Sequence, residues 1–588
     1  MAITPIWPAA SAVDSETGAL TFHGRTAESL LDEFGSPLYL IDTDEVRDRA
    51  RHFVKAAADA FHTSTTHVSF AGKAFLSKEI VRIVTEAGML VDTCSMGEMR
   101  IALAAGAPGR RLVLHGNNKT DEEIALAIEE GFAKIVVDSP DEPARIAAIA
   151  EKLGKRAKVM LRVTAGIHAG GHEYISTAHE DQKFGVPLLP TGADAGVLGV
   201  LDTLAAEPDA ATPAATNARL VERGDHPQSA SRTAPASGSG EGAGPRAGFV
   251  SGSGEGAGPR AGFVSGSGEG AGPRAESVSG SGEGAGARGA RELQYDVKYP
   301  YDLSHEQVSE TDKALAEAMS TVADGPALAV LKDILRHQDT LELVGIHSHI
   351  GSNIHDADAF IQAAKRMMLL RKTFYATDAY TLPEVDLGGG YSVAYTDGED
   401  SMDVRRELTR LAEAVTGINR ALGMPAPAIS FEPGRWIVAP AGVTLYRVGT
   451  IKPVHLSDAK DKAGEPITER VYVSVDGGMS DNIRPALYGA DYTARLANRR
   501  GSDETMLVRV VGMHCESGDI VVHEVRLPAD LKRGDILAVP VTGAYGRTMA
   551  SNYNQALIPA VVGVSESGAH VMLRRQTIDD LLSLDVSE

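Results

Sequence analysis

The sequence predicts an α/β protein in which a (β/α)8 barrel is followed by a C-terminal antiparallel β domain. Three observations predict this architecture. Apolar runs alternate with amphipathic stretches up to about residue 440, valine-rich runs then follow at close spacing, and a glycine-rich repeat interrupts the alternation. Strands that alternate with helices indicate a parallel sheet, and eight such units indicate a closed barrel.

Each predicted barrel strand is an apolar run with β-type composition. The runs cover His67–Ala71, Met89–Thr93, Arg111–Gly116, Ala133–Asp138, Ala157–Thr164, Leu341–Ile350, Glu384–Leu387 and Ala428–Glu432. The stretches Lys78–Ala87, Glu98–Ala105 and Asp141–Leu153 carry the helical periodicity expected between strands.

The second domain is predicted from valine-rich runs separated by turns. These runs are Arg470–Val475, Leu507–Met513, Ile520–Leu527 and Asp535–Thr542. Close spacing with few helical patterns favours antiparallel pairing. We expect the barrel domain over residues 43–435 and the β domain over 436–588, with residues 1–42 adding to the β domain.

A low-complexity insertion separates the fifth and sixth predicted barrel strands. Four copies of a 14-residue unit that opens SGSGEGAG begin at Ser237, Ser251, Ser265 and Ser279. Such a composition cannot bury enough apolar surface to offset its ordering entropy. We therefore expect disorder over about 207–295, either as a recognition arm or as a flexible insertion that expanded by duplication.

Composition restricts the class of protein. A length of 588 residues exceeds the roughly 250–300 residues that one hydrophobic core supports, so more than one domain is expected. A net charge of −22 argues against binding to nucleic acid or to an anionic membrane. The two cysteines, Cys94 and Cys515, cannot form a disulfide framework. With no signal peptide in Met1–Gly18 and no membrane-spanning run, a cytoplasmic location is expected.

Polar and glycine residues follow the predicted barrel strands, where a barrel places its active site. They are Lys73, the segment His115–Lys119, Asp138–Ser139, His347–Ser352, Gly388–Tyr391 and Glu432–Arg435. This agreement between strand ends and reactive residues supports both the strand assignment and an active site at that edge.

The residue types at these strand ends suit pyridoxal phosphate. Backbone amides of Gly388–Gly390 and the hydroxyl of Ser352 would bind a phosphate. A partly desolvated Lys73 could form a Schiff base, and Glu432 could hold a protonated ring nitrogen. Taken singly, the glycines could form a tight turn, Lys73 a surface charge, and Glu432 an ion pair with Arg435. No metal site is expected.

The sequence resembles the diaminopimelate decarboxylases, a family within the fold-type III pyridoxal-phosphate decarboxylases. The motifs that carry the resemblance are Ala71–Ala74, His115–Lys119, Gly345–Ser352, Glu432–Arg435, Asp476–Asp481, Arg484–Tyr488, Cys515–Asp519 and Gly543–Tyr545. Two features depart from the family: the insertion, and Phe70 where the family usually has tyrosine.

The resemblance implies a role for each matching residue. Lys73 would hold the cofactor as a Schiff base, His349 would stack on its ring, and Cys515 would donate a proton. The implied cofactor-binding set is Lys73, His349, Ser352, Gly389, Glu432, Pro433, Gly434, Arg435 and Tyr545. The implied substrate-binding set is Arg435, Arg484, Tyr488, Glu516 and Tyr545. In this family the cysteine loop reaches the barrel of a partner subunit, so a homodimer is implied, whereas Cys94 is expected to pack in the core.

The implied reaction is decarboxylation of meso-2,6-diaminopimelate to L-lysine and CO2, the last step of lysine biosynthesis. Arg435 and Arg484 suit the second carboxylate of this substrate, and Glu516 suits its second ammonium. Two alternatives stay open. One is a related decarboxylase acting on ornithine, arginine or lysine, and the other is a non-catalytic regulatory relative, which would be expected to lack Lys73 or Cys515.

Overall fold

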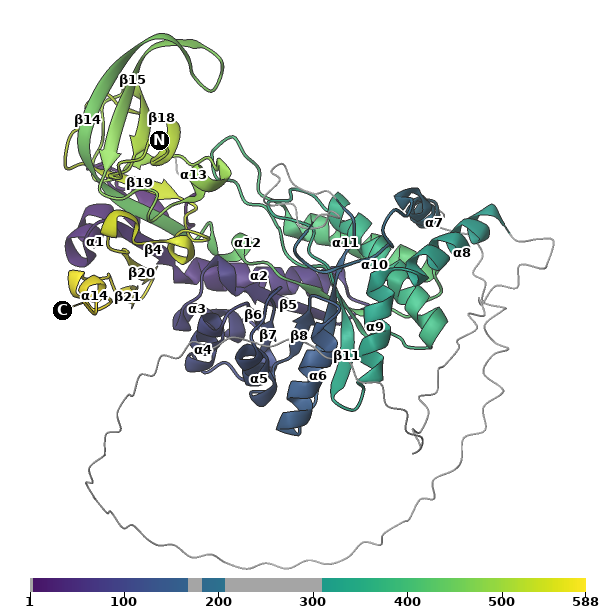
Figure 1. The fold of residues 1–588 in the computed structure, drawn as a ribbon. Coiled ribbons are helices and arrows are strands. Elements are labelled where there is room, and N and C mark those ends of the chain that lie inside the picture. Colours follow the sequence, from purple (N-terminus) through teal and green to yellow (C-terminus); the bar gives the residue numbers. More distant parts are fainter. Residues whose placement is uncertain (1–3, 168–181, 207–308, 588) are drawn as a thin grey trace, which may run out of the picture. The chain divides into compact units, whose positions relative to one another are not determined.

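The computed structural model describes residues 4–167, 182–206 and 309–587, which form a barrel and a β domain (Figure 1). The insertion predicted over about 207–295 lies outside the described residues, so its disorder stays a prediction.

A closed ring of parallel strands forms the barrel, as predicted. Its strands are β5 (Thr66–Ala71), β6 (Leu90–Thr93), β7 (Leu112–Leu114), β8 (Lys134–Val137), β9 (Ala157–Thr164), β11 (Leu341–His347), β12 (Glu384–Asp386) and β13 (Ala428–Phe431). The ring closes because β13 pairs with β5 and β8 pairs with β9. Every apolar run assigned to the barrel overlaps one of these strands, and seven of the eight runs contain the whole strand.

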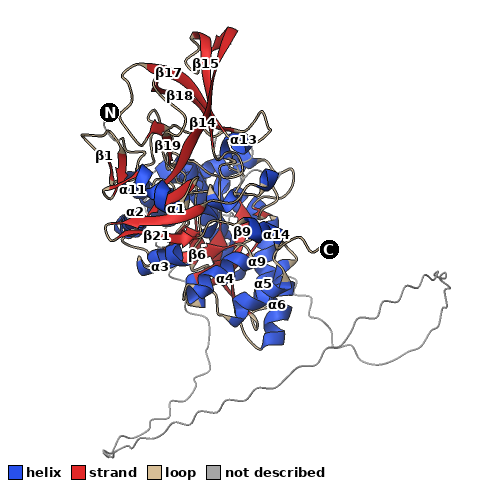
Figure 2. Cartoon of the chain, turned by 90° about the vertical axis from the view of Figure 1, so that its left-hand side faces the viewer, coloured by secondary structure: helices blue, strands red, loops and turns tan. Residues whose placement is uncertain are grey.

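Helices cover the outside of the ring (Figure 2). They are α2 (Thr43–Ala60), α3 (Lys78–Glu86), α4 (Met96–Ala104), α5 (Asp121–Glu129), α6 (Glu142–Leu153), α9 (Pro326–Arg336), α10 (Asp358–Asp378) and α11 (Val404–Ala421). Ser77, Ser95 and Thr120 begin α3, α4 and α5 by accepting hydrogen bonds from free amides of the first turn. Apolar residues at helical spacing, such as Ile80, Val81 and Val84 of α3, then face the barrel core.

Additional elements flank the insertion. The short strand β10 (Val186–Pro187) extends the sheet beside β9, and α7 (Val200–Ala206) and α8 (Glu310–Ala323) lie on either side of the undescribed segment. Strand β9 pairs directly with β11, from Leu341 opposite Ala157 to His347 opposite Arg162. The barrel ring therefore closes through the pairing of β9 with β11, although residues 207–308 separate these two strands in the sequence.

The second sheet forms the β domain, with the path β18-β17-β15-β14-β4-β20-β21 and β19 pairing with β14 and β16. Its strands are β4 (Leu38–Asp42), β14 (Gly442–Lys460), β15 (Pro466–Val475), β16 (Arg495–Leu496), β17 (Thr505–Val511), β18 (Ile520–Pro528), β19 (Ile536–Pro540), β20 (Ala560–Ser565) and β21 (Gly568–Leu573). Most pairs are antiparallel, but β15–β17 and β4–β20 are parallel. The strand β4 lies within residues 1–42.

The smaller N-terminal elements are β1 (Ser11–Val13), β2 (Leu20–Phe22), β3 (Arg25–Thr26) and α1 (Ala27–Phe34). The short helices are α12 (Arg435–Val438), α13 (Arg484–Tyr488) and α14 (Ile578–Leu582).

The chain crosses between the two sheets at two adjacent places. Asp42 ends β4 and also caps α2, where its side chain accepts from the amides of Asp44 and Glu45. The chain returns from β13 through α12 to β14, and β14 pairs antiparallel with β4 from Gly442 opposite Ile41. The β domain is thereby attached at the carboxyl edge of the barrel.

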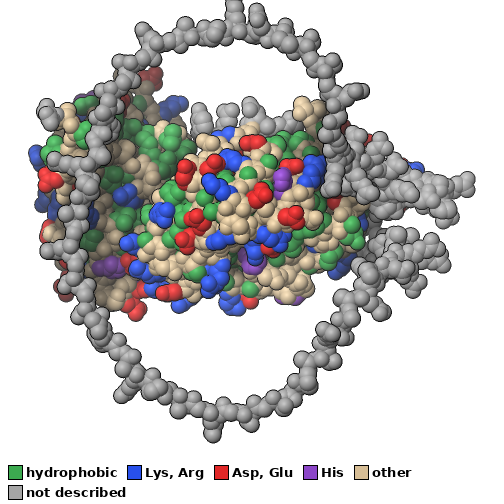
Figure 3. Space-filling model, turned by 60° about the horizontal axis from the view of Figure 1, so that its bottom comes forward, with side chains coloured by type: hydrophobic (Ala, Val, Ile, Leu, Met, Phe, Trp, Pro, Cys, Tyr) green, Lys and Arg blue, Asp and Glu red, His purple; other side chains and the backbone are tan. Residues whose placement is uncertain are grey.

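Charged side chains of both signs are intermixed on the barrel face in Figure 3. Among the described helices, none alone is long and apolar enough to cross a membrane, although α8 and α9 reach those limits as a pair bent by 61°.

We expect the fold to persist when residues 210–292 are replaced by a short Gly/Ser linker, because β9 and β11 pair without them. The midpoint of thermal unfolding, followed by circular dichroism, should change by less than about 3 °C. A matched control replaces the buried α8 residues Leu315 and Met319 with serine and should lower the midpoint clearly. A large destabilisation by the linker would show that the insertion supports the barrel.

Candidate active site

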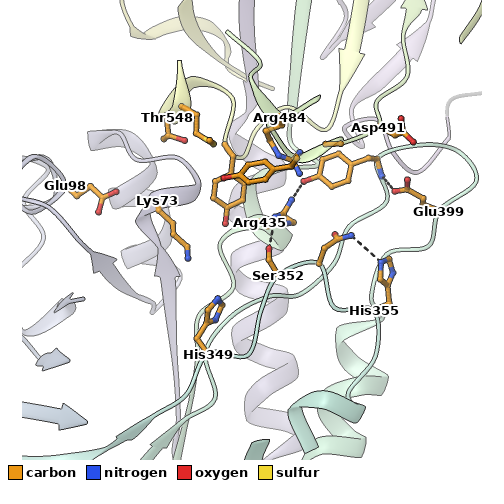
Figure 4. Close-up of a pocket in the computed structure, with 16 residues that line it drawn as sticks. Lys73, Glu98, His349, Ser352, His355, Glu399, Arg435, Arg484, Asp491 and Thr548 are labelled. Atoms are coloured by element: carbon orange, nitrogen blue, oxygen red, sulfur yellow. Dashed lines mark hydrogen bonds between the residues drawn. The ribbon is translucent and has the colours of Figure 1, made fainter. Parts of the chain in front are cut away.

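A pocket of about 770 Å³ lies where the carboxyl edge of the barrel meets the β domain (Figure 4). The barrel contributes Lys73, Glu98, His349, Ser352, Asn353, His355, Tyr395, Glu399 and Arg435. The β domain contributes Arg484, Tyr488, Ala490, Asp491, Tyr545, Thr548 and Met549. Seven of the residues predicted for the site thus line one cavity: Lys73, His349, Ser352, Arg435, Arg484, Tyr488 and Tyr545.

Lys73 lies on a short 3-10 turn, Gly72–Ala74, directly after β5. A Cβ atom on Gly72 would lie 2.5 Å from the carbonyl oxygen of Asp92, so only glycine fits this turn. The β domain holds the other end of the turn, because the Tyr545 amide donates to the Ala74 carbonyl at 2.8 Å. The Lys73 side chain is exposed to the pocket.

Tyr545 adopts a left-handed backbone conformation, with φ of 60°. A non-glycine residue in this region is strained by about 1–3 kcal/mol unless its surroundings fix it. Here the hydrogen bond to Ala74 fixes the backbone, and the Arg435 guanidinium carbon lies 4.9 Å from the centre of the Tyr545 ring. This backbone conformation places the Tyr545 ring at the pocket.

The glycine triplet after β12 allows three loops to approach backbone to backbone. A Cβ on Gly389 would lie 2.3 Å from the Glu432 carbonyl oxygen, and a Cβ on Gly390 would lie 2.5 Å from that of Gly351. The Gly389 amide donates to Nδ1 of His349 at 3.2 Å. The triplet therefore fixes the loops that carry His349 and Glu432.

Glu432, at the end of β13, faces two histidines. Its Oε1 lies 3.2 Å from Nε2 of His115 and 3.2 Å from Nε2 of His347, and His115 lies 3.6 Å from Asp92. Burial alone would raise the pKa of Glu432, but the charges of His347 and His115 hold that pKa well below its ordinary value. Glu432 is thus held as a carboxylate.

The pKa values of His115 and Asp92, which lie near Glu432, are raised rather than lowered. Burial lowers the pKa of His115, but the negative charges of Glu432 and Asp92 outweigh burial and raise that pKa to about 9. Burial, followed by the Glu432 charge, raises the pKa of Asp92 to about 6. The base of the pocket is therefore a buried cluster in which an imidazolium neutralises part of the acidic charge.

The alternative interpretation of Glu432, an ion pair with Arg435, does not match the geometry. Arg435 instead donates to the Tyr395 hydroxyl and, at 2.8 Å, to Ser352 Oγ. Its Nε is buried without an acceptor among the residues that the structure describes. Figure 4 shows Arg435 and Arg484 reaching the pocket from different parts of the chain.

No ion pair to either guanidinium is present among the described residues. Arg484 donates to the Tyr492 hydroxyl and packs over the Tyr395 ring, with its guanidinium carbon 4.5 Å from the ring centre. The acidic residues nearby are engaged elsewhere: Asp491 pairs with Lys462 at 2.7 Å, and Glu399 accepts from the Tyr395 amide at 2.8 Å. The rim of the pocket therefore carries two buried positive charges suited to anionic ligand groups.

Six predicted site residues do not line the pocket. Pro433 and Gly434 are buried at the start of α12, where a Cβ on Gly434 would lie 2.9 Å from the Ala71 Cβ. Cys515 and Glu516 are exposed on the loop between β17 and β18, and Glu516 accepts from the Tyr553 hydroxyl at 2.5 Å. Gly389 and Glu432 lie directly beneath the pocket wall, behind His349.

The expectation that Cys94 packs in the core is wrong. Cys94 is exposed after β6, and its Sγ lies 3.3 Å from Glu98 Oε2. Although the residue is exposed as a whole, neighbouring groups partly desolvate the thiol, and this effect and Glu98 raise its pKa to about 12 against the lowering effect of the Lys73 charge.

Sequence reasoning missed several residues of the site. They are Asp92, Glu98, Tyr395, Asp386, His347 in its contact with Glu432, and Tyr492. Asp92 and Asp386 were detectable as acids in otherwise apolar strands of a barrel. Tyr395 and Tyr492 lie in irregular loops, where no periodicity indicates which way a side chain points.

The chain is similar to known decarboxylases along nearly its whole length. The family model of the pyridoxal binding domain of pyridoxal-dependent decarboxylases matches residues 44–198 and 323–439. The chain is 35% identical to the diaminopimelate decarboxylase of Corynebacterium efficiens, over 99% of this chain and 94% of that protein. It is 34% identical to the diaminopimelate decarboxylase of Mycobacterium tuberculosis, over 99% of this chain and 98% of that protein.

Solved structures show the same fold. The diaminopimelate decarboxylase of M. jannaschii in complex with L-lysine matches with a TM-score of 0.66 and 23% identity, covering 99% of this chain and 98% of that chain. The enzyme of Helicobacter pylori, also complexed with L-lysine, matches with a TM-score of 0.60 and 23% identity, covering 95% and 98%. From its full-length identity to these curated relatives, the chain belongs to the diaminopimelate decarboxylase family of pyridoxal-phosphate-dependent lyases.

Proposed function

We propose that this chain decarboxylates meso-2,6-diaminopimelate to L-lysine and CO2, the last step of lysine biosynthesis, with pyridoxal phosphate as cofactor. One observation carries the proposal: a lysine amine and two guanidiniums without a carboxylate partner in the described chain line one pocket, and a buried carboxylate lies beneath its wall. Relatives that are named diaminopimelate decarboxylase, and that match this chain along nearly its full length, support it.

The donor set fits pyridoxal phosphate. The orphaned Nε of Arg435 and the Ser352 hydroxyl beside it suit a phosphate, and the Lys73 amine opens into the same cavity. Bound pyridoxal phosphate supplies an electron sink for the pair of electrons left when the C–C bond to CO2 breaks. We assign its binding to Lys73, His349, Ser352, Gly389, Tyr545 and the segment Glu432–Arg435.

Glu432 would keep a proton on the ring nitrogen of the cofactor. His115 and His347 both contact Oε1, which leaves Oε2 to accept the hydrogen bond from that nitrogen. Because the two histidines lower the pKa of Glu432, its carboxylate stays charged and stabilises a positive ring. His349, whose pKa burial and the Lys73 charge hold well below the ordinary value, would present a neutral ring to the cofactor.

Arg484 and Tyr488 would bind the second carboxylate of the substrate, together with Arg435 and Tyr545. A guanidinium binds a carboxylate as a planar fork and favours it by roughly 1.5–3 kcal/mol. Ornithine and lysine have no second carboxylate, so a decarboxylase for those substrates would leave the buried Arg484 without its ligand. This contrast favours diaminopimelate over the related substrates.

Cys515 and Glu516 would act from a partner subunit of a homodimer. In one chain both are exposed and outside the pocket, and the described pocket lining contains no cysteine. On this proposal the Cys515 thiol protonates the carbon that loses CO2, and Glu516 binds the second ammonium of the substrate.

We also propose a cytoplasmic enzyme built from residues 43–435 as the barrel domain and 436–588 plus 1–42 as the β domain. Two free cysteines are compatible with a reducing compartment. The pairing of β4 with β14 and β20 supports assigning residues 1–42 to the β domain.

The direct test mixes the purified protein with pyridoxal phosphate and meso-diaminopimelate and measures CO2 and lysine. We expect Lys73→Ala to lower turnover by about a thousandfold or more, because no other lysine lines the described pocket. The visible absorption of the protein-bound cofactor should disappear with it. Lys78→Ala, an exposed lysine at the start of α3, is the matched control and should change neither property. An unchanged cofactor spectrum in Lys73→Ala would refute the assignment, and faster turnover of ornithine than of diaminopimelate would refute the substrate.

A subunit-mixing experiment tests whether the site is composite. Lys73→Ala and Cys515→Ala should each be nearly inactive as homodimers. After subunit exchange they should recover activity, because one of the two sites in a mixed dimer then contains both native residues. Mixing Lys73→Ala with Arg435→Ala is the control and should recover nothing, since both residues belong to the same barrel. Absence of recovery with proven exchange would mean that Cys515 acts within its own chain.

A further inference from the structure

Tyr395 lies between the two guanidiniums of the pocket. Arg435 donates a hydrogen bond to its hydroxyl. The guanidinium carbon of Arg484 lies 4.5 Å from the ring centre, and that of Arg435 lies 5.7 Å from it. One side chain therefore contacts a cation from the barrel and a cation from the β domain.

The position of Tyr395 is fixed from several sides. The residue is only 5% exposed, and its amide donates to the Glu399 carboxylate at 2.8 Å. The Tyr492 ring meets the Tyr395 ring edge to face, at 5.3 Å between centres and 77° between planes. Since Tyr492 also accepts a hydrogen bond from Arg484, the two tyrosines hold this arginine on two sides.

Charge explains why a tyrosine suits this place. Two buried guanidiniums repel each other, and a carboxylate between them would offset one of the two positive charges and weaken their affinity for an anionic ligand. A phenol offers one polar oxygen and the negative face of its ring, and it adds no full charge. Burial raises the pKa of Tyr395, but the charges of Arg435 and Arg484 outweigh burial and lower it.

We propose that Tyr395 is a specificity-determining positioning residue that holds Arg484 and Arg435 ready for the substrate carboxylate farther from the reacting carbon. The proposal rests on the proposed function, because it assumes a substrate with two carboxylates. Neither the composition of the strand ends nor the motifs of the sequence assign a role to Tyr395.

The test uses the holoenzyme and two ligands that differ by one carboxylate. L-Lysine retains the carboxylate that is not lost in the reaction, whereas cadaverine is the same diamine without it. Binding is measured by calorimetry for the unaltered holoenzyme, for Tyr395→Phe, which removes the hydroxyl, and for Tyr395→Leu, which also removes the ring. Tyr380→Phe is the matched control, because it removes a hydroxyl that donates to the Leu343 carbonyl at 2.6 Å outside the pocket.

We expect Tyr395→Phe to weaken L-lysine binding about fivefold and Tyr395→Leu to weaken it tenfold or more, with cadaverine binding unchanged. The KM for diaminopimelate should rise by similar factors, while kcat and the absorption of the bound cofactor stay within about twofold. Tyr380→Phe should leave both ligands and both kinetic constants unchanged.

Three results would overturn the proposal. Equal weakening of L-lysine binding and cadaverine binding would mean that Tyr395 has only a general structural role. Unchanged L-lysine binding in both variants would mean that Tyr395 plays no part in binding this carboxylate. If the unaltered holoenzyme neither decarboxylates diaminopimelate nor binds L-lysine, the proposed function fails and this assignment fails with it. The behaviour of the unaltered holoenzyme thus distinguishes the two failures.

Discussion

A backbone contact between Gly442, Gly543 and Val438 determines where the β domain meets the barrel. A Cβ atom on Gly543 would lie 1.9 Å from the Val438 carbonyl oxygen, and one on Gly442 would lie 2.1 Å from the Gly543 amide nitrogen. Only glycine permits this approach. The segment after Gly543 is consequently delivered to the Lys73 turn, where Tyr545 bonds Ala74. Without that contact, the pocket would lack its β-domain wall.

The two ends of the resulting pocket carry opposite charges. Its base contains the acids Glu432, Asp92 and Asp386, which His115 and His347 partly neutralise. Its rim contains Arg435 and Arg484, with only neutral hydrogen-bond partners in the described chain. A ligand with a positive ring at one end and anionic groups at the other is therefore oriented by charge before any shape complementarity is considered.

Much of this arrangement follows from the sequence. The barrel strands end in Lys73, His349, Ser352, Glu432 and Arg435, and the topology of a barrel brings strand ends together whatever their separation in the chain. The insertion does not obscure this pattern, because β9 and β11 remain recognisable on either side of it.

Other features depend on tertiary contacts that local patterns do not encode. The outer half of β14 is largely exposed and polar, so its 19-residue length could not be predicted from hydrophobic alternation. The contact of Tyr395 with Arg484 joins an irregular loop of the barrel to the first residue of α13 in the β domain. Cys94 resembled a core residue by type, yet it follows a barrel strand at the open edge, where side chains face the pocket region.

The most direct measurement compares Arg484→Ala with the unaltered enzyme for two properties: kcat/KM for meso-diaminopimelate and the affinity for pyridoxal phosphate. We expect kcat/KM to fall about ten- to a hundredfold, through loss of one charge-assisted carboxylate contact, while cofactor affinity stays within about twofold. Arg533→Ala, an exposed arginine of the same domain, should alter neither. Equal losses of kcat/KM and cofactor affinity would place Arg484 at the cofactor and contradict its assignment to the substrate carboxylate.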